Sequence, residues 1–336
     1  MKSSVSFNNE ILENAAKQFS TSSSQASYIG GHQNIVYEYK LNGESFILRL
    51  TPSTGRSVRL VQSELDWIVF LANNGVSVSK PVLSKNGHLT EVIHLSDGFY
   101  TCVSFEKARG RRVEYPECLQ DHALYEELGR LTGKLHALSK RYQPQDCNAK
   151  RQDWSQNWFL QNIDLIPDSQ VAVRYSYLEL VKTISALPKD KKSYGIIHGD
   201  LNVGNFMVDE HRGVTLFDFD EAQYSWFVED IAVQLYYLVY VYGGDDGKEY
   251  REDQARRFMN HFMRGYILED SLDEYWIKQI PLFLRLRELI VYIGSFRNWD
   301  GDETFSGSDN QWFKDWIAES KLRIENEIPI VNIWGI

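Results

Sequence analysis

The sequence is poor in cysteine. Its 336 residues include Cys102, Cys118 and Cys147, and none of these stands in a C-x-x-C pair. An odd number of cysteines without such pairing argues against a metal–thiolate site and is typical of a protein that is kept reduced. We therefore expect a cytoplasmic location.

Long apolar runs and an excess of basic residues are also missing. The N-terminus has no basic region followed by an apolar one, so we expect no secretory signal. The longest nearly apolar run, residues 231–242, includes Gln234 and is too short to cross a bilayer, which predicts a buried helix and no membrane partner. The 46 acidic residues outnumber the 36 basic ones, and this net charge of -10 argues against a nucleic-acid partner, because phosphates need a basic surface.

The most informative segment runs from residue 194 to residue 218 and reads YGIIHGDLNVGNFMVDEHRGVTLFD. Short apolar runs alternate in it with polar turns that contain glycine, which predicts three short strands with polar side chains at their ends. We expect those side chains to converge on one cleft. They are His198, Asp200, Asn205 and Asp218.

These residue types suit phosphoryl transfer, in which a protein mainly positions the phosphoryl group and neutralises its charge. Mg²⁺ takes one or two carboxylate or amide oxygens from a protein and fills its other positions with phosphate and water, and Asn205 and Asp218 fit that role. Asp200 stands five positions before Asn205, the offset found in the kinase loop H-R-D-x-x-x-x-N, where the Asp orients or accepts the proton of the substrate hydroxyl. Gly199 replaces the Arg of that loop.

The pattern H-G-D-x-x-x-x-N, followed by a hydrophobic residue and Asp218, resembles the aminoglycoside phosphotransferase and choline kinase superfamily, a branch of the protein-kinase-like fold. Residues 281–299, PLFLRLRELIVYIGSFRNW, are similar to bacterial type II homoserine kinase-like and stress-response kinase-like members. The resemblance implies an α+β, bilobal fold with ATP and Mg²⁺ as cofactors. We expect a small N-lobe with an antiparallel sheet over residues 1–104, a hinge at 105–108 and a larger, mainly helical C-lobe over 109–336.

In the N-lobe we expect a five-stranded antiparallel sheet with one helix. Asn42-Gly43 is a strong hairpin signal, and Arg49 falls on the second strand of that hairpin. Residues 58–74 have the apolar spacing of a helix and include Glu64. The resemblance implies that Arg49 forms an ion pair with the nucleotide phosphates and that Glu64 pairs with Arg49 and orients it. The alternatives are that Arg49 faces solvent on its strand and that Glu64 is exposed on its helix. Backbone groups near Phe105 and Lys107 would bind the adenine.

Four further residues are given other roles. We expect His136 and His198 to serve packing and loop bracing, and Asp230 to accept backbone N–H bonds at a helix start. Asp220 is open to a second-metal role. The Gly30-Gly31 pair is either a phosphate-covering loop or a plain turn.

The acceptor is expected to be a small molecule with a hydroxyl group. Between Asp218 and Asp230 there is no A-P-E motif and no room for an activation loop. Net acidity and abundant aromatic residues favour an acceptor that carries an amine, which rings can bind by cation–π attraction. The aromatic candidates, of which core packing will take most, are Trp154, Trp158, Phe159, Tyr224, Trp226, Phe227 and Trp299.

The sequence therefore predicts an ATP- and Mg-dependent phosphotransferase that acts on an amino alcohol, an amino acid or an aminoglycoside-like compound. A protein serine/threonine kinase of the bacterial stress-response type is the alternative. A non-catalytic nucleotide-binding module is a further alternative, which the presence of Asp200, Asn205 and Asp218 opposes.

Overall fold

The computed structural model describes residues 6–31, 33–146, 150–244, 246–298 and 301–335. The chain forms two compact units, each built from segments that are distant in sequence. The sheet unit comprises Met1–Arg111, Tyr142–Arg151 and Phe206–Asp220; the helical unit comprises Arg112–Arg141, Gln152–Asn205 and Glu221–Ile336. The predicted lobe boundaries, with the hinge at 105–108, stay a prediction.

The sheet unit contains a six-stranded antiparallel sheet. Its order is β1-β2-β3-β6-β4, and β5 also pairs with β6. These strands are β1 (Ala26–Gly30), β2 (Ile35–Leu41), β3 (Glu44–Pro52), β4 (Pro81–Val82), β5 (Glu91–His94) and β6 (Phe99–Glu106). A separate antiparallel pair is formed by β8 (Phe206–Val208) and β9 (Val214–Leu216).

Two helices accompany the sheet, α1 (Asn9–Gln18) and α2 (Val58–Asn73). The sequence predicts the second helix and five of the strands, but neither α1 nor β1. The strand β1 is mostly exposed, so its sequence lacks the alternation that marks a half-buried strand.

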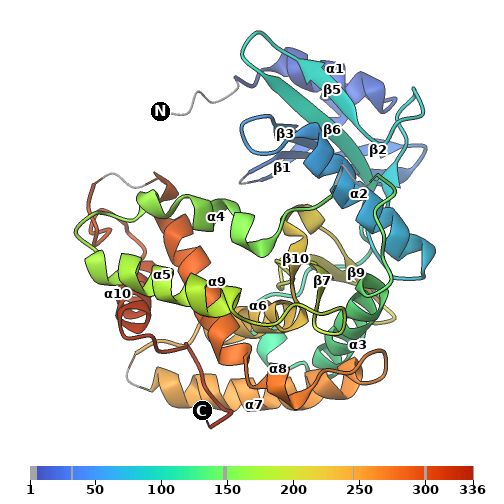
Figure 1. Ribbon diagram of the computed structural model, residues 1–336. Helices are drawn as coiled ribbons and strands as arrows, with labels where there is room; N and C mark the ends of the chain where they lie inside the picture. The colour runs from blue at the N-terminus through green and yellow to red at the C-terminus, as the bar shows by residue number, and fades with distance from the viewer. Residues whose placement is uncertain (1–5, 32, 147–149, 245, 299–300, 336) are drawn as a thin grey trace. The chain divides into compact units, whose positions relative to one another are not determined.

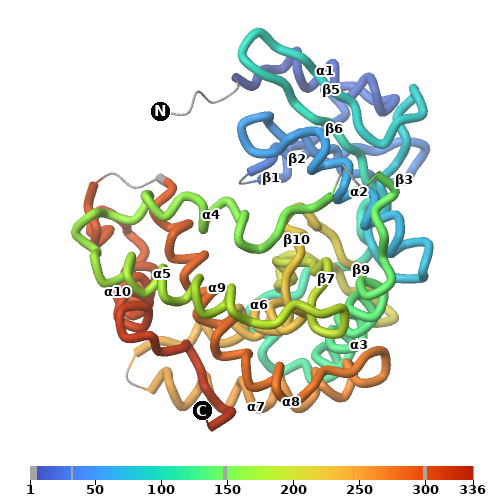
Figure 2. The backbone as a smooth tube through the Cα atoms, in the orientation of Figure 1, coloured from blue at the N-terminus to red at the C-terminus, as the bar shows by residue number. Residues whose placement is uncertain are grey.

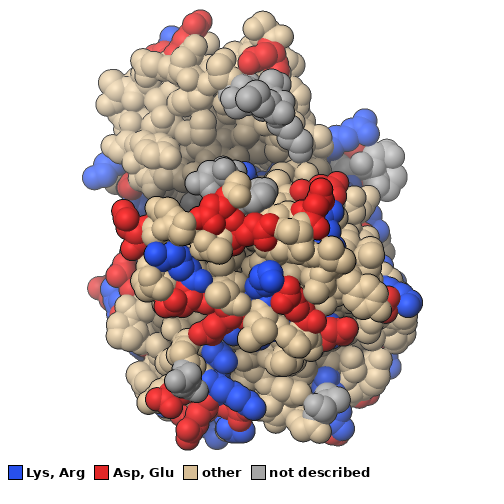
Figure 3. All heavy atoms as spheres, turned by 90° about the vertical axis from the view of Figure 1, so that its left-hand side faces the viewer, with Lys and Arg blue, Asp and Glu red and all other residues tan. Residues whose placement is uncertain are grey.

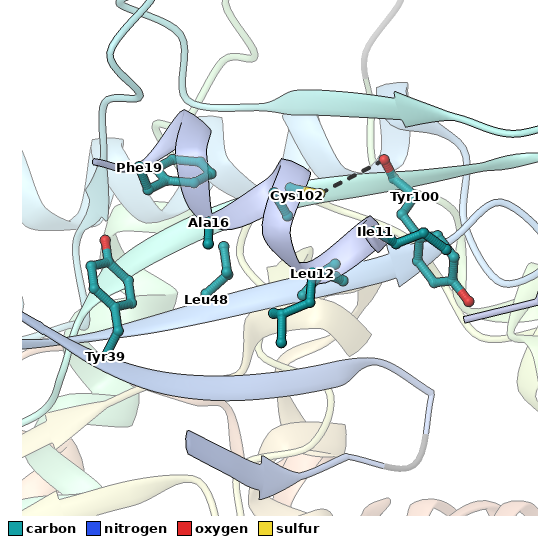
Figure 4. Close-up of a cluster of buried hydrophobic side chains, with 10 residues drawn as sticks. Ile11, Leu12, Ala16, Phe19, Tyr39, Leu48, Tyr100 and Cys102 are labelled. Carbon is teal, nitrogen blue, oxygen red and sulfur yellow. Dashed lines mark hydrogen bonds between the residues drawn. The ribbon is translucent and has the colours of Figure 1, made fainter. Parts of the chain in front are cut away.

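The apolar face of α1 packs on the sheet and forms a core (Figure 4). The Asn8 side chain caps this helix by accepting a hydrogen bond from the N–H of Ile11. Burying this apolar face is what stabilises so short a helix, since isolated helices of this length are marginal in water. The buried members of the core are Ile11, Leu12, Ala15, Ala16, Phe19, Tyr39, Leu48, Leu50, Tyr100 and Cys102.

Helix α2 lies within the predicted range 58–74. Ser57 caps it by accepting a hydrogen bond from the N–H of Leu60, and Gly75, with φ of +74°, follows its C-terminus. Its buried positions include Val61 and Leu65 and, among them, Glu64. A fully buried carboxylate on an apolar helix face needs a cationic partner.

The helical unit holds the remaining helices and a short antiparallel pair of strands, β7 (Tyr194–Ile197) and β10 (Gln223–Trp226). The helices are α3 (His122–Ser139), α4 (Trp158–Gln161), α5 (Val171–Ser185), α6 (Phe227–Val239), α7 (Gly247–Tyr266), α8 (Glu274–Ile277), α9 (Ile280–Ser295) and α10 (Gln311–Glu325). Figure 1 shows their order along the chain, and in Figure 2 α5, α9 and α10 lie side by side. The run 231–242 falls largely in α6, which is buried as predicted.

Glycines allow α3 and α7 to pack closely. A Cβ atom at Gly129 would lie 1.9 Å from the carbonyl oxygen of Phe262, and one at Gly265 would lie 1.8 Å from that of Glu126. Neither contact is possible for a larger residue. These glycines therefore set the distance between the two helices.

The surface of the helical unit carries charges of both signs. In the lower part of the face shown in Figure 3, acidic and basic side chains are interspersed. Within the described residues, no helix is long and apolar enough to span a membrane. The fold is thus α+β, with an antiparallel sheet in its N-terminal part and a helical C-terminal part, as the sequence predicts.

Candidate active site

Arg49 and Glu64 form a buried ion pair in the sheet unit. Arg49 lies on β3, and its Nη1 and Nη2 donate to the two carboxylate oxygens of Glu64 at 2.8 and 2.7 Å. Arg49 is 5% exposed and Glu64 is fully buried. Such a two-pronged contact fixes both position and orientation of the guanidinium. The predicted pair therefore exists, and neither residue is the exposed side chain of the alternatives.

The surroundings of Arg49 favour its charged form. Burial lowers the pKa of Arg49, but Glu64, Asp220 and Asp218 together raise it above its ordinary value. Its guanidinium carbon lies 5.1 Å from the centre of the Phe105 ring. Its Nε is buried and has no hydrogen-bond partner among the described residues. Arg49 is thus a fixed cation with one donor atom left over.

Asp220 is held by polar partners from three segments of the sheet unit. Its Oδ2 accepts hydrogen bonds from Nδ2 of Asn34 at 2.8 Å and from Nη1 of Arg56 at 2.9 Å. Arg151 donates to its backbone carbonyl at 2.6 Å. Burial raises the pKa of Asp220, but Arg56, Arg49 and Asn34 lower it below its ordinary value. A second-metal role for Asp220 would compete with these partners, and it stays a prediction.

Asp218 follows β9 and has a backbone φ of +63°. Few residue types other than glycine adopt this left-handed conformation, and Asp is one that tolerates it. A short 3₁₀ turn, Phe219–Glu221, begins at the next residue. The local backbone therefore turns sharply at the predicted metal ligand.

The predicted adenine-binding segment is an extension of the sheet. The backbone N–H of Glu106 donates to the carbonyl of Lys80 at 2.8 Å, and that of Lys107 donates to the carbonyl of Ser45 at 3.1 Å. The Lys107 side chain pairs with Glu38 at 2.7 Å. These two N–H groups are therefore already used, and an adenine contact at Phe105 and Lys107 stays a prediction.

In the helical unit, Asp200 and Asn205 lie on the loop that follows β7. The Nδ2 group of Asn205 donates to the carbonyl oxygen of Asp200 at 2.8 Å and to its carboxylate Oδ2 at 3.1 Å. Both bonds use the amide nitrogen, so the amide oxygen of Asn205 remains as a ligand atom. The offset of five residues thus brings the two side chains together, as the sequence predicts.

Asp230, in the first turn of α6, accepts hydrogen bonds from the backbone of this loop. Its Oδ2 accepts from the backbone N–H of His198 at 2.9 Å, and its Oδ1 accepts from that of Gly199 at 2.8 Å. His136 Nε2 lies 3.3 Å from Oδ2. Burial raises the pKa of Asp230, but His136, His198 and the Gly199 N–H lower it below its ordinary value. Asp230 thus accepts backbone N–H bonds and is structural, as expected, but these N–H groups belong to the loop and not to the start of its own helix. The contacts of the buried His136 agree with its expected structural role.

The backbone at position 199 requires glycine, which is why the loop reads H-G-D. Its φ is +79°, and a Cβ atom there would lie 2.4 Å from the backbone oxygen of Glu221. An Arg at this position would be strained in its backbone and would collide with that oxygen. The departure from H-R-D therefore follows from a close approach of two backbones.

Arg287, on α9, contacts this loop and is not among the predicted site residues. Its Nη2 forms an ion pair with Oδ1 of Asp200 and donates to the hydroxyl of Tyr237 at 2.8 Å. It stands 87 residues after Asp200, on a helix that also carries Arg285 and Glu288, so its charge alone does not mark it as a site residue. No short motif joins the two residues. Only the tertiary fold brings them together.

Three of the aromatic residues proposed as a cage belong to the core, and Trp158, Phe159 and Tyr224 are half-buried. Trp154, Trp226 and Phe227 are at most 1% exposed. Trp158 and Phe159 flank the guanidinium of Arg297, each ring centre lying 5.0 Å from it, so they already bind a cation of the chain itself. Trp299, like Cys147, lies outside the described residues.

The predicted site residues fall into two groups. Arg49, Glu64 and Phe105 are in contact within the sheet unit, and Asp218 lies in the same unit. Asp200 and Asn205 are in contact within the helical unit. That the two groups converge on one cleft stays a prediction.

The donor set suits Mg²⁺. Among the residues that the structure describes, no three His, Cys, Asp or Glu side chains gather to hold a metal. The predicted ligand atoms, an amide oxygen of Asn205 and a carboxylate of Asp218, are of the kinds that Mg²⁺ takes from proteins when phosphates and water complete its shell. That these two residues bind a metal together stays a prediction.

Comparison with known proteins adds independent evidence. The family model described as "Phosphotransferase enzyme family" matches residues 27–268. Amicoumacin kinase of Bacillus subtilis (strain 168) is 35% identical over 324 residues, which cover 96% of this chain and 93% of the relative. A solved amicoumacin kinase in complex with AMP-PNP, Ca²⁺ and Ami has a TM-score of 0.87 and 33% identity, covering 97% of this chain and 95% of that chain. A microcompartment-associated aminopropanol kinase shares the fold, with a TM-score of 0.74, 20% identity and coverage of 95% and 97%.

Proposed function

Because this chain belongs to the phosphotransferase enzyme family, we propose that it moves the γ-phosphate of ATP, with Mg²⁺, to a hydroxyl group of amicoumacin or a chemically related small molecule. The predicted family and the predicted activity are confirmed: the chain is a kinase that acts on an alcohol group of a small molecule. The observation that carries the finer proposal is the 35% identity to amicoumacin kinase over 96% of the chain. The solved relative also binds a nucleotide analogue and a divalent ion, which supports the same needs here.

Each side chain has a role in the proposed reaction. The acceptor oxygen bonds to the γ-phosphorus while the bond from that phosphorus to the ADP oxygen breaks, and the hydroxyl proton passes to Asp200. Asn205 orients Asp200 through its amide nitrogen. When bound by Asn205 and Asp218, Mg²⁺ would neutralise phosphate charge.

Arg49 is assigned to the nucleotide phosphates. The Glu64 carboxylate accepts one hydrogen bond from each Nη group, and each of these groups keeps a second N–H that can bind a phosphate oxygen. A guanidinium already fixed in place loses little entropy when a phosphate binds. This supports a role in ATP affinity rather than in proton transfer.

The segment after Asp218 favours a small acceptor over a protein segment. It runs through the Phe219–Glu221 turn and β10 directly into α6, which starts at Phe227. This leaves no activation loop of the protein-kinase kind. ATP as donor, together with the free, buried Cys102 and Cys118, fits the proposed cytoplasmic location.

An acceptor panel tests the proposed substrate class. We expect ADP release in Mg-ATP to rise with amicoumacin and with amine-bearing alcohols, and to fall when the acceptor amine is acetylated, because an uncharged amide loses ion pairing and cation–π contact. Added salt should weaken the same acceptors by screening. Sugars without an amine serve as the control, and equal stimulation by acetylated and free amines would refute the amine requirement.

Replacing Arg49 should weaken ATP binding. We expect Arg49→Lys to raise the KM for ATP about tenfold or more, because Lys keeps the charge but cannot grip Glu64 with two donors. Arg49→Ala should also destabilise the fold by about 3–5 kcal/mol, since it leaves Glu64 buried without a partner. Steady-state kinetics and thermal unfolding measure both effects.

The exposed Arg59, also in the sheet unit, gives a matched control. Arg59→Ala should change neither the KM for ATP nor the unfolding temperature. An unchanged KM for ATP in a folded Arg49→Lys variant would remove Arg49 from the nucleotide site.

A further inference from the structure

Arg287 contacts the loop that carries Asp200 at two points. Its Nη2 is ion-paired with Oδ1 of Asp200, and its Nη1 lies 3.4 Å from the carbonyl oxygen of Gly199. The side chain is buried, with 9% of its residue exposed. Burying a cation costs free energy unless an anion pairs with it, and Asp200 is the anion that pairs with Arg287.

Tyr237 fixes the guanidinium from α6. Its hydroxyl accepts from Nη2 of Arg287 at 2.8 Å, and the Arg287 guanidinium carbon lies 5.0 Å from the centre of its ring. The Tyr115 hydroxyl in turn donates to the carbonyl of Tyr237. The ring contact and the hydrogen bond together restrict the orientation of the planar guanidinium, a restraint that the flexible ammonium of Lys does not provide.

The electrostatic surroundings of Arg287 favour its charged form. Burial lowers its pKa, but Tyr237, Asp200 and Glu221 raise it above its ordinary value. Glu229, at the start of α6, is a further carboxylate that interacts with it electrostatically. Arg287 is therefore a permanent cation beside the carboxylate that the proposed reaction uses.

We propose that Arg287 is a positioning residue that acts through Asp200. This rests on the proposed function. By holding Oδ1, Arg287 sets the rotation of the carboxylate and leaves Oδ2, the oxygen 3.1 Å from the amide nitrogen of Asn205, to receive the acceptor hydroxyl. Arg287 and Asn205 thus hold the Asp200 carboxylate from two sides.

A double-mutant cycle tests this role. We expect Arg287→Met to lower kcat about 10²-fold with an unchanged KM for ATP, because a misplaced reacting group costs rate rather than nucleotide binding. Arg287→Lys should recover part of that loss, and Tyr237→Phe, which removes one hydrogen bond, should cost less. In an Asp200→Asn background, Arg287→Met should cost little more, since its effect passes through the carboxylate that is already lost.

Arg285 provides a matched control on the same helix, where it pairs with Glu327 at 2.9 Å. Arg285→Met should leave kcat unchanged, and thermal unfolding reports whether each variant is folded. If Arg287→Met does not fold, Arg287→Lys completes the cycle. Losses from Arg287 and Asp200 that multiply independently would overturn the inference alone, whereas full turnover by Asp200→Asn would overturn the proposed role of Asp200 and the inference with it.

Discussion

The Asp200→Asn variant should lose phosphate transfer while it still binds Mg-ATP. Asp200 contacts Asn205 and Arg287, and its assigned task is the acceptor hydroxyl, so the substitution removes a proton acceptor and leaves the nucleotide site in place. General-base contributions are about 10²–10⁴-fold, and we expect kcat to fall within that range. Single-turnover transfer and nucleotide titration measure the two properties separately.

Glu210→Gln is the control for this substitution. It also converts a carboxylate to an amide, but Glu210 is exposed on the turn between β8 and β9. Its activity should equal that of the wild type. Near-normal turnover of Asp200→Asn would show that another group takes the proton.

The Asp218→Asn variant should lose the dependence of nucleotide affinity on Mg²⁺. Asn tolerates the left-handed backbone that Asp218 adopts, so this change removes the charge with little backbone strain. Because Asp218 is assigned as the main carboxylate ligand, we expect ATP to bind with about the same affinity with and without Mg²⁺. Asn205→Ala should lower activity in a way that excess Mg²⁺ partly restores.

Nucleotide titrations in Mg²⁺ and in EDTA compare these variants with the wild type. The Glu210→Gln variant again serves as the control. An Asp218→Asn protein that keeps the wild-type difference between the two conditions would rule out Asp218 as the metal ligand.

The Arg49–Glu64 pair could be predicted because local patterns place both residues. The hairpin signal fixes the strand of Arg49, and helical spacing fixes the face of Glu64. The resemblance to known kinases supplied the link between the two elements. In the same way, the spacing of Asp200 and Asn205 is local, and a loop of five residues leaves few ways to arrange them.

Arg287 could not be predicted, because its partner lies 87 residues away and α9 also carries Arg285 and Glu288, so the sequence does not show which of these charged residues contacts Asp200. The partners of Asp220, Asn34 and Arg56, come from loops whose paths depend on the whole unit. Short-range periodicity contains no information on such pairs. They become visible only when the packing of the elements is known.

Aromatic content is a poor guide to a binding site. By sequence, Trp154 and Trp226 are candidates for binding the amine of an acceptor, yet both are buried, and their ring centres lie 5.8 Å apart in the core. Because large aromatic rings bury more apolar area than other side chains, most of them are found in the core rather than in a binding site. The composition was informative about the size of the core rather than about the acceptor.

The central claim is that the phosphate goes to a small molecule, and following labelled γ-phosphate from ATP tests it most directly. In Mg²⁺, with amicoumacin or another amine-bearing alcohol and a generic protein substrate present together, we expect the label in the small molecule, and we expect Asp200→Asn to abolish its transfer. Label found in the protein substrate or in this chain itself, with none in the small molecule, would contradict the account and favour a protein kinase.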